Sequence, residues 1–217
     1  SVLAMKLFLE KIPKEVIAIT GDDELPTSLS FLPGLKEIVR MDFLQALETY
    51  KPDLFISTDS SDLNRVTMKQ KIAVPLSIRT VVIDHHDNTN FGDINLVNTN
   101  FSSVAEMVYE LQEIWNSQLI DEDISKCIYT GIWSDSYGLV SKKVTPRTLE
   151  IVAKLIEHKV DCFSITRNLI SLNFKLIRLL GKSFTECTKY FKNKVLITKI
   201  AYQDFEALDV RGGDISD

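Results

Sequence analysis

The sequence predicts an α/β protein whose mostly parallel sheet is flanked by helices, followed by a connector helix and the start of a second, smaller α/β domain. Short β-branched runs alternate along the chain with stretches whose apolar residues recur at helical spacing. Parallel strands need a crossover that a helix usually supplies, so this alternation indicates a layered α/β fold. With 217 residues, 45% of them hydrophobic and 25% charged, the chain is long enough for one good core and part of a second.

The first 90 residues contain three apolar runs separated by amphipathic stretches. Residues 1–12 place apolar side chains on one face of a helix, with Ser1 as the one candidate cap. Two prolines and two glycines mark a loop at 21–34. We expect helices at 1–12, 42–50 and 60–74, and strands at 14–20, 53–58 and 79–86.

The rest of the chain is mainly helical in pattern. The clearest helix has Thr145 as its N-cap and Pro146 at its first position. Another begins at Asp121 and is predicted to end near Gly131. We expect a loop rich in Asn and Asp at 87–101, helices at 102–116, from 121 to about 131, at 145–161 and at 163–190, then a strand and a short helix within 193–210.

The composition argues against several classes of protein. A formal net charge of -5 gives no global attraction for nucleic acid, so a polyanionic ligand would need a local basic patch or a bound metal. Cys127, Cys162 and Cys187 are odd in number and lack a CxxC spacing, which favours reduced thiols that pack in the interior. No apolar run has the length of a membrane span and no signal peptide pattern occurs, so we expect a cytoplasmic protein without a membrane partner.

Acidic and imidazole groups stand at or near the ends of three apolar runs. They are Asp59, the run Asp84, His85 and His86, and Asp135. Residues that follow the strands of an open parallel sheet meet at its carboxyl edge, even when they are far apart in sequence. Mixed oxygen and nitrogen ligands without thiolate suit Mn²⁺, Fe²⁺, Co²⁺ or Zn²⁺ better than Ca²⁺, and carboxylates can bridge two ions about 3.5–4 Å apart. The sequence therefore predicts a metal site that could clamp a phosphate and activate a water.

Each of these residues also has a purely structural interpretation. A single Asp such as Asp59 or Asp135 is commonly a helix cap or a turn former. The histidine pair fits a core poorly, because side chains alternate across a strand and one polar ring would be buried on each face. Ser102 and Ser103 are interpreted as helix-entry residues, and a helix N-terminus there could also receive a phosphate oxygen.

Three segments together resemble the motifs of the DHH phosphoesterases. "FISTDSSDLNRV" resembles the second motif of that family, "VIDHHDNTNFGDINLVNTNFSSVAEMVYEL" the third, and "YTGIWSDSYGL" with "TPRTLEIVAKLI" the fourth. Within the family the chain is most similar to the short-oligonucleotide ribonucleases that also dephosphorylate pAp, often called nanoRNases. The resemblance covers nearly the whole chain.

The resemblance implies a Mn²⁺-dependent phosphoesterase that activates water at a two-metal site, with Mg²⁺ or Co²⁺ as alternative ions. It implies that Asp59 bridges both metals, and that His85 and Asp135 complete the shell of one of them. It further implies that His86 contacts the phosphate and that Asp84 orients the imidazoles. The implied substrates are a short RNA or DNA oligonucleotide, pAp or a dinucleotide, and a homodimer is possible.

The resemblance also implies three regions. Residues 1–162 would form an N-terminally incomplete DHH domain, residues 163–192 a connector helix, and residues 193–217 the start of a substrate-binding, DHHA1-like domain. The first motif of the family, a His followed by Asp-x-Asp, does not occur in the chain. We therefore expect the chain to bind one Mn²⁺ weakly. A smaller departure is Tyr137, which stands where the family usually has Gly.

Two other functions stay open. The first is a non-catalytic, degenerate module that binds a metal or a nucleotide. Retention of Asp59, His85, His86 and Asp135 together favours an enzyme over such a module. The second is a manganese-dependent inorganic pyrophosphatase, which is less favoured because the aromatic residues near Asp135 suit a nucleotide better.

Overall fold

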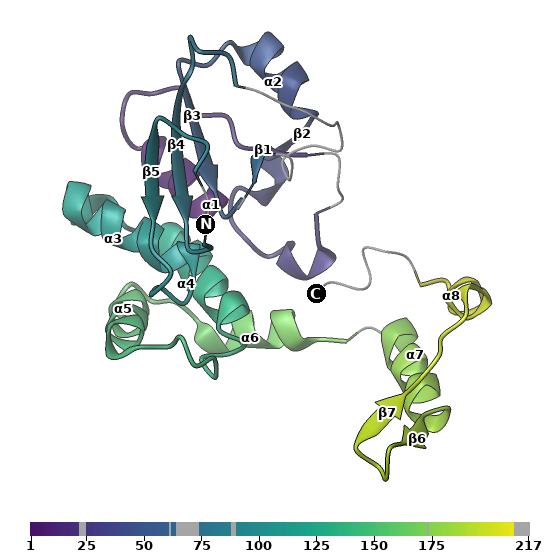
Figure 1. The fold of residues 1–217 in the computed structure, drawn as a ribbon. Helices are drawn as coiled ribbons and strands as arrows, with labels where there is room; N and C mark the ends of the chain where they lie inside the picture. The colour runs from purple at the N-terminus through teal and green to yellow at the C-terminus, as the bar shows by residue number, and fades with distance from the viewer. Residues whose placement is uncertain (22–24, 61, 64–73, 88–89, 173, 211–217) are drawn as a thin grey trace. The chain divides into compact units, whose positions relative to one another are not determined.

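A computed structural model describes residues 1–21, 25–60, 62–63, 74–87, 90–172 and 174–210 of the chain (Figure 1). The protein is a mixed α/β structure with parallel sheets flanked by helices, which confirms the predicted fold class. It divides into two compact units, one of Ser1–Asp23 with Phe31–Thr166 and one of Glu24–Ser30 with Arg167–Asp217. The helix predicted at 60–74 falls mostly outside the described residues.

The first unit is built on a three-stranded parallel sheet with the strand order β3-β4-β5. Ile56 of β3 lies opposite Val81 of β4, and Ile83 of β4 lies opposite Leu96 of β5. A second parallel pair joins β1 and β2. The strands are β1 Ile19–Thr20, β2 Val39–Arg40, β3 Leu54–Thr58, β4 Arg79–Asp84 and β5 Ile94–Val97. Strand β5 lies in the stretch that was predicted to be a loop.

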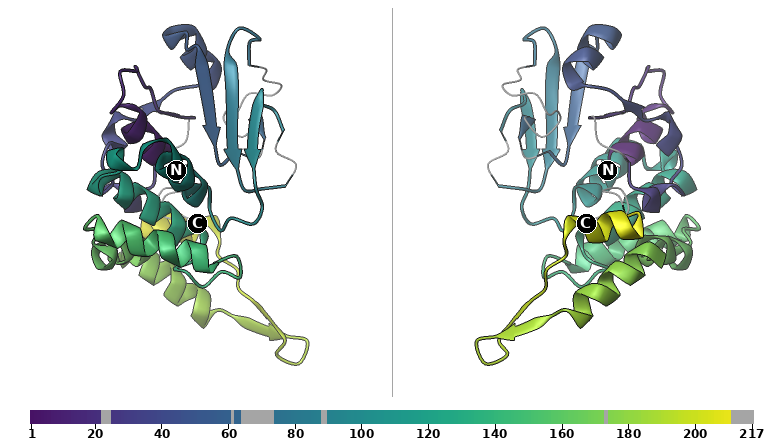
Figure 2. Two further views of the ribbon diagram at one scale, coloured as in Figure 1. Left: turned by 90° about the vertical axis from the view of Figure 1, so that its left-hand side faces the viewer. Right: turned by 90° about the vertical axis from the view of Figure 1, so that its right-hand side faces the viewer.

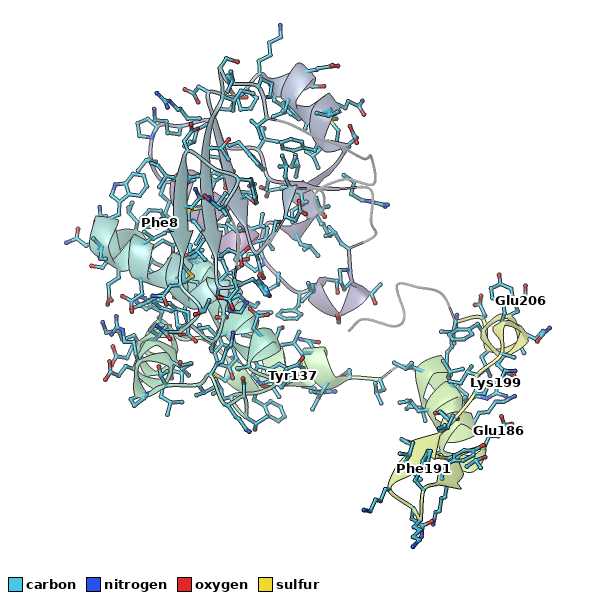
Figure 3. The ribbon with its side chains drawn as sticks, in the orientation of Figure 1. Phe8, Tyr137, Glu186, Phe191, Lys199 and Glu206 are labelled. Carbon is cyan, nitrogen blue, oxygen red and sulfur yellow. The ribbon has the colours of Figure 1, made fainter. Side chains whose placement is uncertain are left out.

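Helices α1, α3 and α4 gather on one face of this sheet (Figure 2). Phe8 of α1 (labelled in Figure 3) is fully buried, and its ring packs 5.7 Å from that of Trp115 in α3. The helices of the unit are α1 Val2–Leu9, α2 Phe43–Tyr50, α3 Val104–Asn116, α4 Glu122–Asp135 and α5 Pro146–Glu157. Helix α6, Cys162–Ile170, contains the boundary between the two units. In the described part of the chain, no helix is both long enough and apolar enough to cross a membrane.

Side-chain caps start α2 and α5 where the sequence predicted these helices, whereas Ser1, the predicted cap of α1, makes no side-chain cap hydrogen bond. Asp42 accepts hydrogen bonds from two backbone N–H groups at the start of α2. At α5, Thr145 and Thr148 form a reciprocal capping box and Pro146 takes the first helical position. These local signals explain why α2 and α5 begin within a residue of the prediction.

Helix α4 continues through Gly131 to Asp135, so the prediction that it ends near Gly131 was wrong. A Cβ added at Gly131 would lie 2.6 Å from the Cβ of Ala105 in α3. Helices α3 and α4 therefore pack closely at a point where only a hydrogen fits. The glycine is required for helix packing and does not terminate the helix.

The second unit contains α7 Phe174–Thr185, a hairpin of β6 Thr188–Tyr190 with β7 Val195–Ile197, and α8 Tyr202–Leu208. Phe191 lies in the turn of the antiparallel hairpin (Figure 3). Lys182 of α7 is paired with Asp204 of α8, which ties the two helices together. The stretch expected as one connector helix is divided between α6, α7 and β6, whereas the strand and short helix predicted within 193–210 are confirmed as β7 and α8.

Candidate metal centre

Asp59 follows β3 directly and has a left-handed backbone. Its φ is 62°, in a region that Asp enters more readily than most residues with a side chain. The backbone N–H of Asp59 donates to the carbonyl oxygen of Ile83 at 3.0 Å, which extends the β3–β4 pairing by one bond. The Asp59 carboxylate is thereby held at the carboxyl edge of the sheet, with 35% of its side chain exposed. Residues other than glycine in this region are often found at functional sites.

Asp84 is the last residue of β4 and has no exposed surface. Its Oδ1 accepts hydrogen bonds from the backbone N–H and from the Nδ1–H of His86, both at 2.8 Å. Its Oδ2 is buried without a hydrogen-bond partner among the residues that the structure describes. An unpaired buried acceptor is costly, so this carboxylate favours a nearby cation or proton donor.

His85 is 8% exposed and its ring is oriented by the main chain. Its Nδ1 lies 3.2 Å from the carbonyl oxygen of Phe101. Since a carbonyl can only accept, Nδ1 carries the proton and Nε2 carries the lone pair. That Nε2 lies 3.8 Å from Oδ1 of Asp59. His85 thus presents a ligand atom to the same space as the Asp59 carboxylate.

Asp59, His85 and His86 form the one cluster of possible metal ligands found within the described parts of the chain. One ligand atom from each lies within 4.8 Å of the other two, and Nδ1 of His86 is 3.8 Å from Oδ1 of Asp59. Because Nδ1 of His86 carries the proton that it donates to Asp84, only Nε2 of that ring could bind a metal. Carboxylate oxygen and imidazole nitrogen donors without thiolate suit Mn²⁺, Co²⁺, Zn²⁺ or Fe²⁺. The donor set therefore fits a divalent transition metal, as the sequence predicted for this edge of the sheet.

Asp135, the last residue of α4, lies within electrostatic range of this cluster. Burial and, next, the negative charge of Asp59 raise the pKa of Asp135 to about 6, while His85 and His86 oppose the rise. Asp135 is not one of the three residues whose ligand atoms lie closest together. Two carboxylates that repel each other are stabilised in their charged forms when a cation binds between them.

The turn after Asp135 has a left-handed backbone. Tyr137 has a φ of 52° and Gly138 a φ of 75°, and the N–H of Gly138 donates to the carbonyl of Trp133 at 2.9 Å. Tyr137 therefore takes up the conformation that glycine would supply without strain at this position. The unusual residue does not prevent the helix from ending at Asp135.

Ser103 is fully buried at the N-terminus of α3. Its Oγ accepts a hydrogen bond from the backbone N–H of Glu106 at 3.2 Å, which is the predicted capping role. Its contact with a substrate phosphate stays a prediction. Two residues near the site were not foreseen, namely Glu106 and Phe101. A Ser-x-x-Glu pattern signals a helix start and so could have drawn attention to Glu106, whereas a backbone carbonyl such as that of Phe101 leaves no trace in the sequence.

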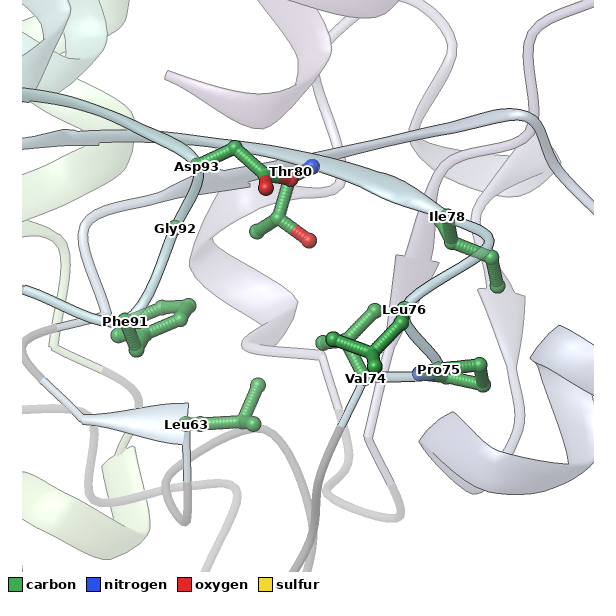
Figure 4. Close-up of a pocket in the computed structure, with 9 residues that line it drawn as sticks. All are labelled: Leu63, Val74, Pro75, Leu76, Ile78, Thr80, Phe91, Gly92 and Asp93. Carbon is green, nitrogen blue, oxygen red and sulfur yellow. Dashed lines mark hydrogen bonds between the residues drawn. The ribbon is translucent and has the colours of Figure 1, made fainter.

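A separate pocket of about 320 Å³ lies at the start of β4, the end of the strand away from His85 (Figure 4). Most of its lining residues are apolar, among them Leu63, Pro75 and Phe91, and Thr80 and Asp93 are its members with polar side chains. The backbone N–H of Thr80 already donates to Oδ2 of Asp93 at 2.8 Å. None of the predicted site residues lines this pocket.

The fold and the cluster define a protein of the α/β class with a candidate divalent-metal centre at the carboxyl edge of a parallel sheet. Residues 1–132 match the DHH family, N-terminal domain. The chain belongs to the DHH family, which confirms the resemblance found in its motifs.

Several known proteins are similar to this chain over part of their own length. A bifunctional oligoribonuclease and PAP phosphatase, NrnA, of Bacillus subtilis is 28% identical over 82% of this chain and 54% of its own length. A probable NrnA of Streptococcus mutans is 22% identical over 94% of this chain and 63% of its own. The crystal structure of an exopolyphosphatase-related protein from Bacteroides fragilis has the same fold, with a TM-score of 0.85 at 22% identity over 98% of this chain and 64% of that one. The chain thus spans less than two thirds of each of these proteins.

Proposed function

We propose that the protein is a metal-dependent phosphoesterase that hydrolyses phosphoester bonds in short oligonucleotides or in small nucleotides such as pAp. The observation that carries the proposal is the convergence of Asp59, His85 and His86 at the carboxyl edge of the sheet in a chain of the DHH family. The names of the Bacillus and Streptococcus relatives, oligoribonuclease and PAP phosphatase, support this choice of substrate.

In this proposal Asp59, His85 and Asp135 hold the metal. Mn²⁺ suits their oxygen and nitrogen donors, and Mg²⁺ or Co²⁺ could replace it. When bound, a divalent ion neutralises phosphate charge and lowers the pKa of a water molecule. His86 contacts the phosphate, and the buried Asp84 carboxylate fixes the imidazole of His86 through the 2.8 Å bond to Nδ1.

The regions expected from the sequence belong to the same proposal. Residues 1–162 form the metal-binding domain, residues 163–192 connect it to the following region, and residues 193–217 begin a substrate-binding domain. A pair of chains is proposed as the assembly. Substrate choice would then depend on both domains, so the reaction is tested with all the residues of the chain present.

The test measures Mn²⁺-dependent hydrolysis of a diribonucleotide, pAp and pyrophosphate by the wild type and by Asp59→Ala and His85→Ala. We expect hydrolysis of the diribonucleotide or pAp, its loss on chelation, and a fall of at least about 100-fold in both variants. Asp53→Asn, on the exposed residue just before β3, is the control and should retain activity. Unimpaired hydrolysis in both alanine variants would contradict the site. Turnover of pyrophosphate alone would identify a pyrophosphatase, and metal binding without any turnover would identify a non-catalytic module.

A further inference from the structure

Glu106 is a buried carboxylate in the first turn of α3, where it is 2% exposed. It accepts a hydrogen bond from the hydroxyl of Ser102, and the backbone N–H of Ser102 and the hydroxyl of Thr148 in α5 lie close enough to interact with it. Burial raises the pKa of the Glu106 carboxyl, and these polar neighbours oppose the rise. A carboxylate that is buried at this cost needs its hydrogen-bond partners, so it holds them firmly in place.

One of those partners belongs to the peptide group that orients His85. The N–H of Ser102, which faces the Glu106 carboxylate, and the C=O of Phe101, which lies 3.2 Å from Nδ1 of His85, are the two ends of a single peptide group. The peptide is planar and trans, so its N–H and C=O point in opposite directions. Fixing the N–H on the side of Glu106 therefore fixes the carbonyl on the side of His85.

The segment that carries this peptide is also anchored upstream. The backbone N–H of Asn98 donates to the carbonyl of Asp84 at 3.0 Å, which continues the pairing of β4 with β5. The N–H of Phe101 donates to the carbonyl of Asn98 at 3.4 Å. With Asn98 held by the sheet, Glu106 supplies the second anchor of the segment, at its junction with α3.

We propose that Glu106 is a positioning residue for His85, because it holds the Phe101–Ser102 peptide so that the carbonyl keeps the imidazole proton on Nδ1. The lone pair on Nε2 then faces Asp59, where Nε2 and Oδ1 are 3.8 Å apart. This inference rests on the proposed role of His85 as a metal ligand. Without the restraint, the ring also samples the tautomer with its proton on Nε2, which cannot ligate a metal through that atom.

The test reads the tautomer of His85 in the metal-free protein by long-range proton–nitrogen NMR at alkaline pH. The chain has only three histidines, so single substitutions of His86 and His158 assign the signals. We expect wild-type His85 to carry its proton on Nδ1. Glu106→Gln should shift a large fraction of molecules to the Nε2–H tautomer and weaken Mn²⁺ binding by about 10–100-fold.

Two further variants make the result specific. Glu106→Asp keeps the charge, but its side chain is shorter by one methylene and its carboxylate lies further from Ser102. It should also shift His85 toward the Nε2–H tautomer. Glu110→Gln lies one turn further along α3, where its carboxylate pairs with Arg147 at 2.6 Å, and it should leave the tautomer and the Mn²⁺ affinity unchanged. Circular dichroism and urea unfolding establish which variants are folded.

An unchanged Nδ1–H population in the folded Glu106 variants would overturn the inference, as would an equal shift in Glu110→Gln. Because the tautomer is read without metal, this result is separate from the proposed function. If Glu106→Gln shifts the tautomer but the wild type binds no Mn²⁺, the positioning role of Glu106 is supported and only the proposed metal site is contradicted.

Discussion

The Nδ1 of His86 lies 2.8 Å from the Oδ1 of Asp84, a carboxylate with no exposed surface. This bond joins the end of β4 to the imidazole assigned to the substrate phosphate. Asp84→Asn keeps the size of the side chain but removes its charge, so we expect kcat on a diribonucleotide to fall about 10–100-fold in a folded protein.

A control for this change is Asp93, which precedes β5 and binds the backbone near the start of β4. Asp93→Asn retains an oxygen that can accept from the Thr80 N–H, and it should leave kcat unchanged. A kcat in Asp84→Asn equal to that of the wild type would show that the buried carboxylate does not orient His86.

Gly131→Ala should destabilise the first unit. The added Cβ would lie 2.6 Å from the Cβ of Ala105, and overpacking of this kind costs about 1–3 kcal/mol. Helix propensity alone has the opposite sign, since alanine is favoured over glycine by about 1 kcal/mol. The control is Gly181→Ala in α7, where an added Cβ meets nothing within 4 Å and only helix propensity acts. Comparing the urea unfolding of Gly131→Ala and Gly181→Ala therefore separates overpacking from helix propensity. A Gly131→Ala protein as stable as Gly181→Ala would contradict the close packing of α3 and α4.

Asp135→Asn should stabilise the metal-free chain at neutral pH. Burial and the charge of Asp59 raise the pKa of Asp135 to about 6, from an ordinary value of 3.8. The folded state therefore prefers the protonated acid, so stability falls as the pH rises from 3.8 through 6 and the full penalty is present above that range. We expect a rise in Tm of about 2–4 °C at pH 7.5 and none below pH 3.8.

Glu113→Gln supplies a control of opposite sign for the pH dependence. The hydrogen bond from Lys154, followed by that from Arg147, lowers the pKa of Glu113, so its charge stabilises the fold at neutral pH. Its substitution should lower Tm at pH 7.5. An equal gain in Tm for Asp135→Asn at both pH values would show that the charge of Asp135 is not responsible.

Local sequence signals predicted a large part of this structure. The cap at Thr145, the proline after it and the two serines before α3 fixed where helices begin, because each satisfies a backbone group within one turn. The positions of Asp59 and His85 followed from the rule that parallel strands bring their ends to one edge.

Contacts between distant segments could not be predicted in this way. Gly131 looks like a helix end until Ala105 is seen against it, and strand β5 needs β4 beside it to be more than a polar loop. The orientation of His85 depends on the backbone carbonyl of Phe101. Every residue has such a carbonyl, so the sequence does not show which one binds the imidazole.

The most direct measurement is a titration of the metal-free protein with Mn²⁺, followed by the electron paramagnetic resonance of the free ion. We expect the wild type to bind Mn²⁺, and Asp59→Ala and His85→Ala each to weaken binding at least about 100-fold. His158→Ala, at the end of α5, is the matched histidine control and should bind as the wild type does. Equal Mn²⁺ affinity in the wild type, Asp59→Ala and His85→Ala would contradict a metal centre at the carboxyl edge of the sheet.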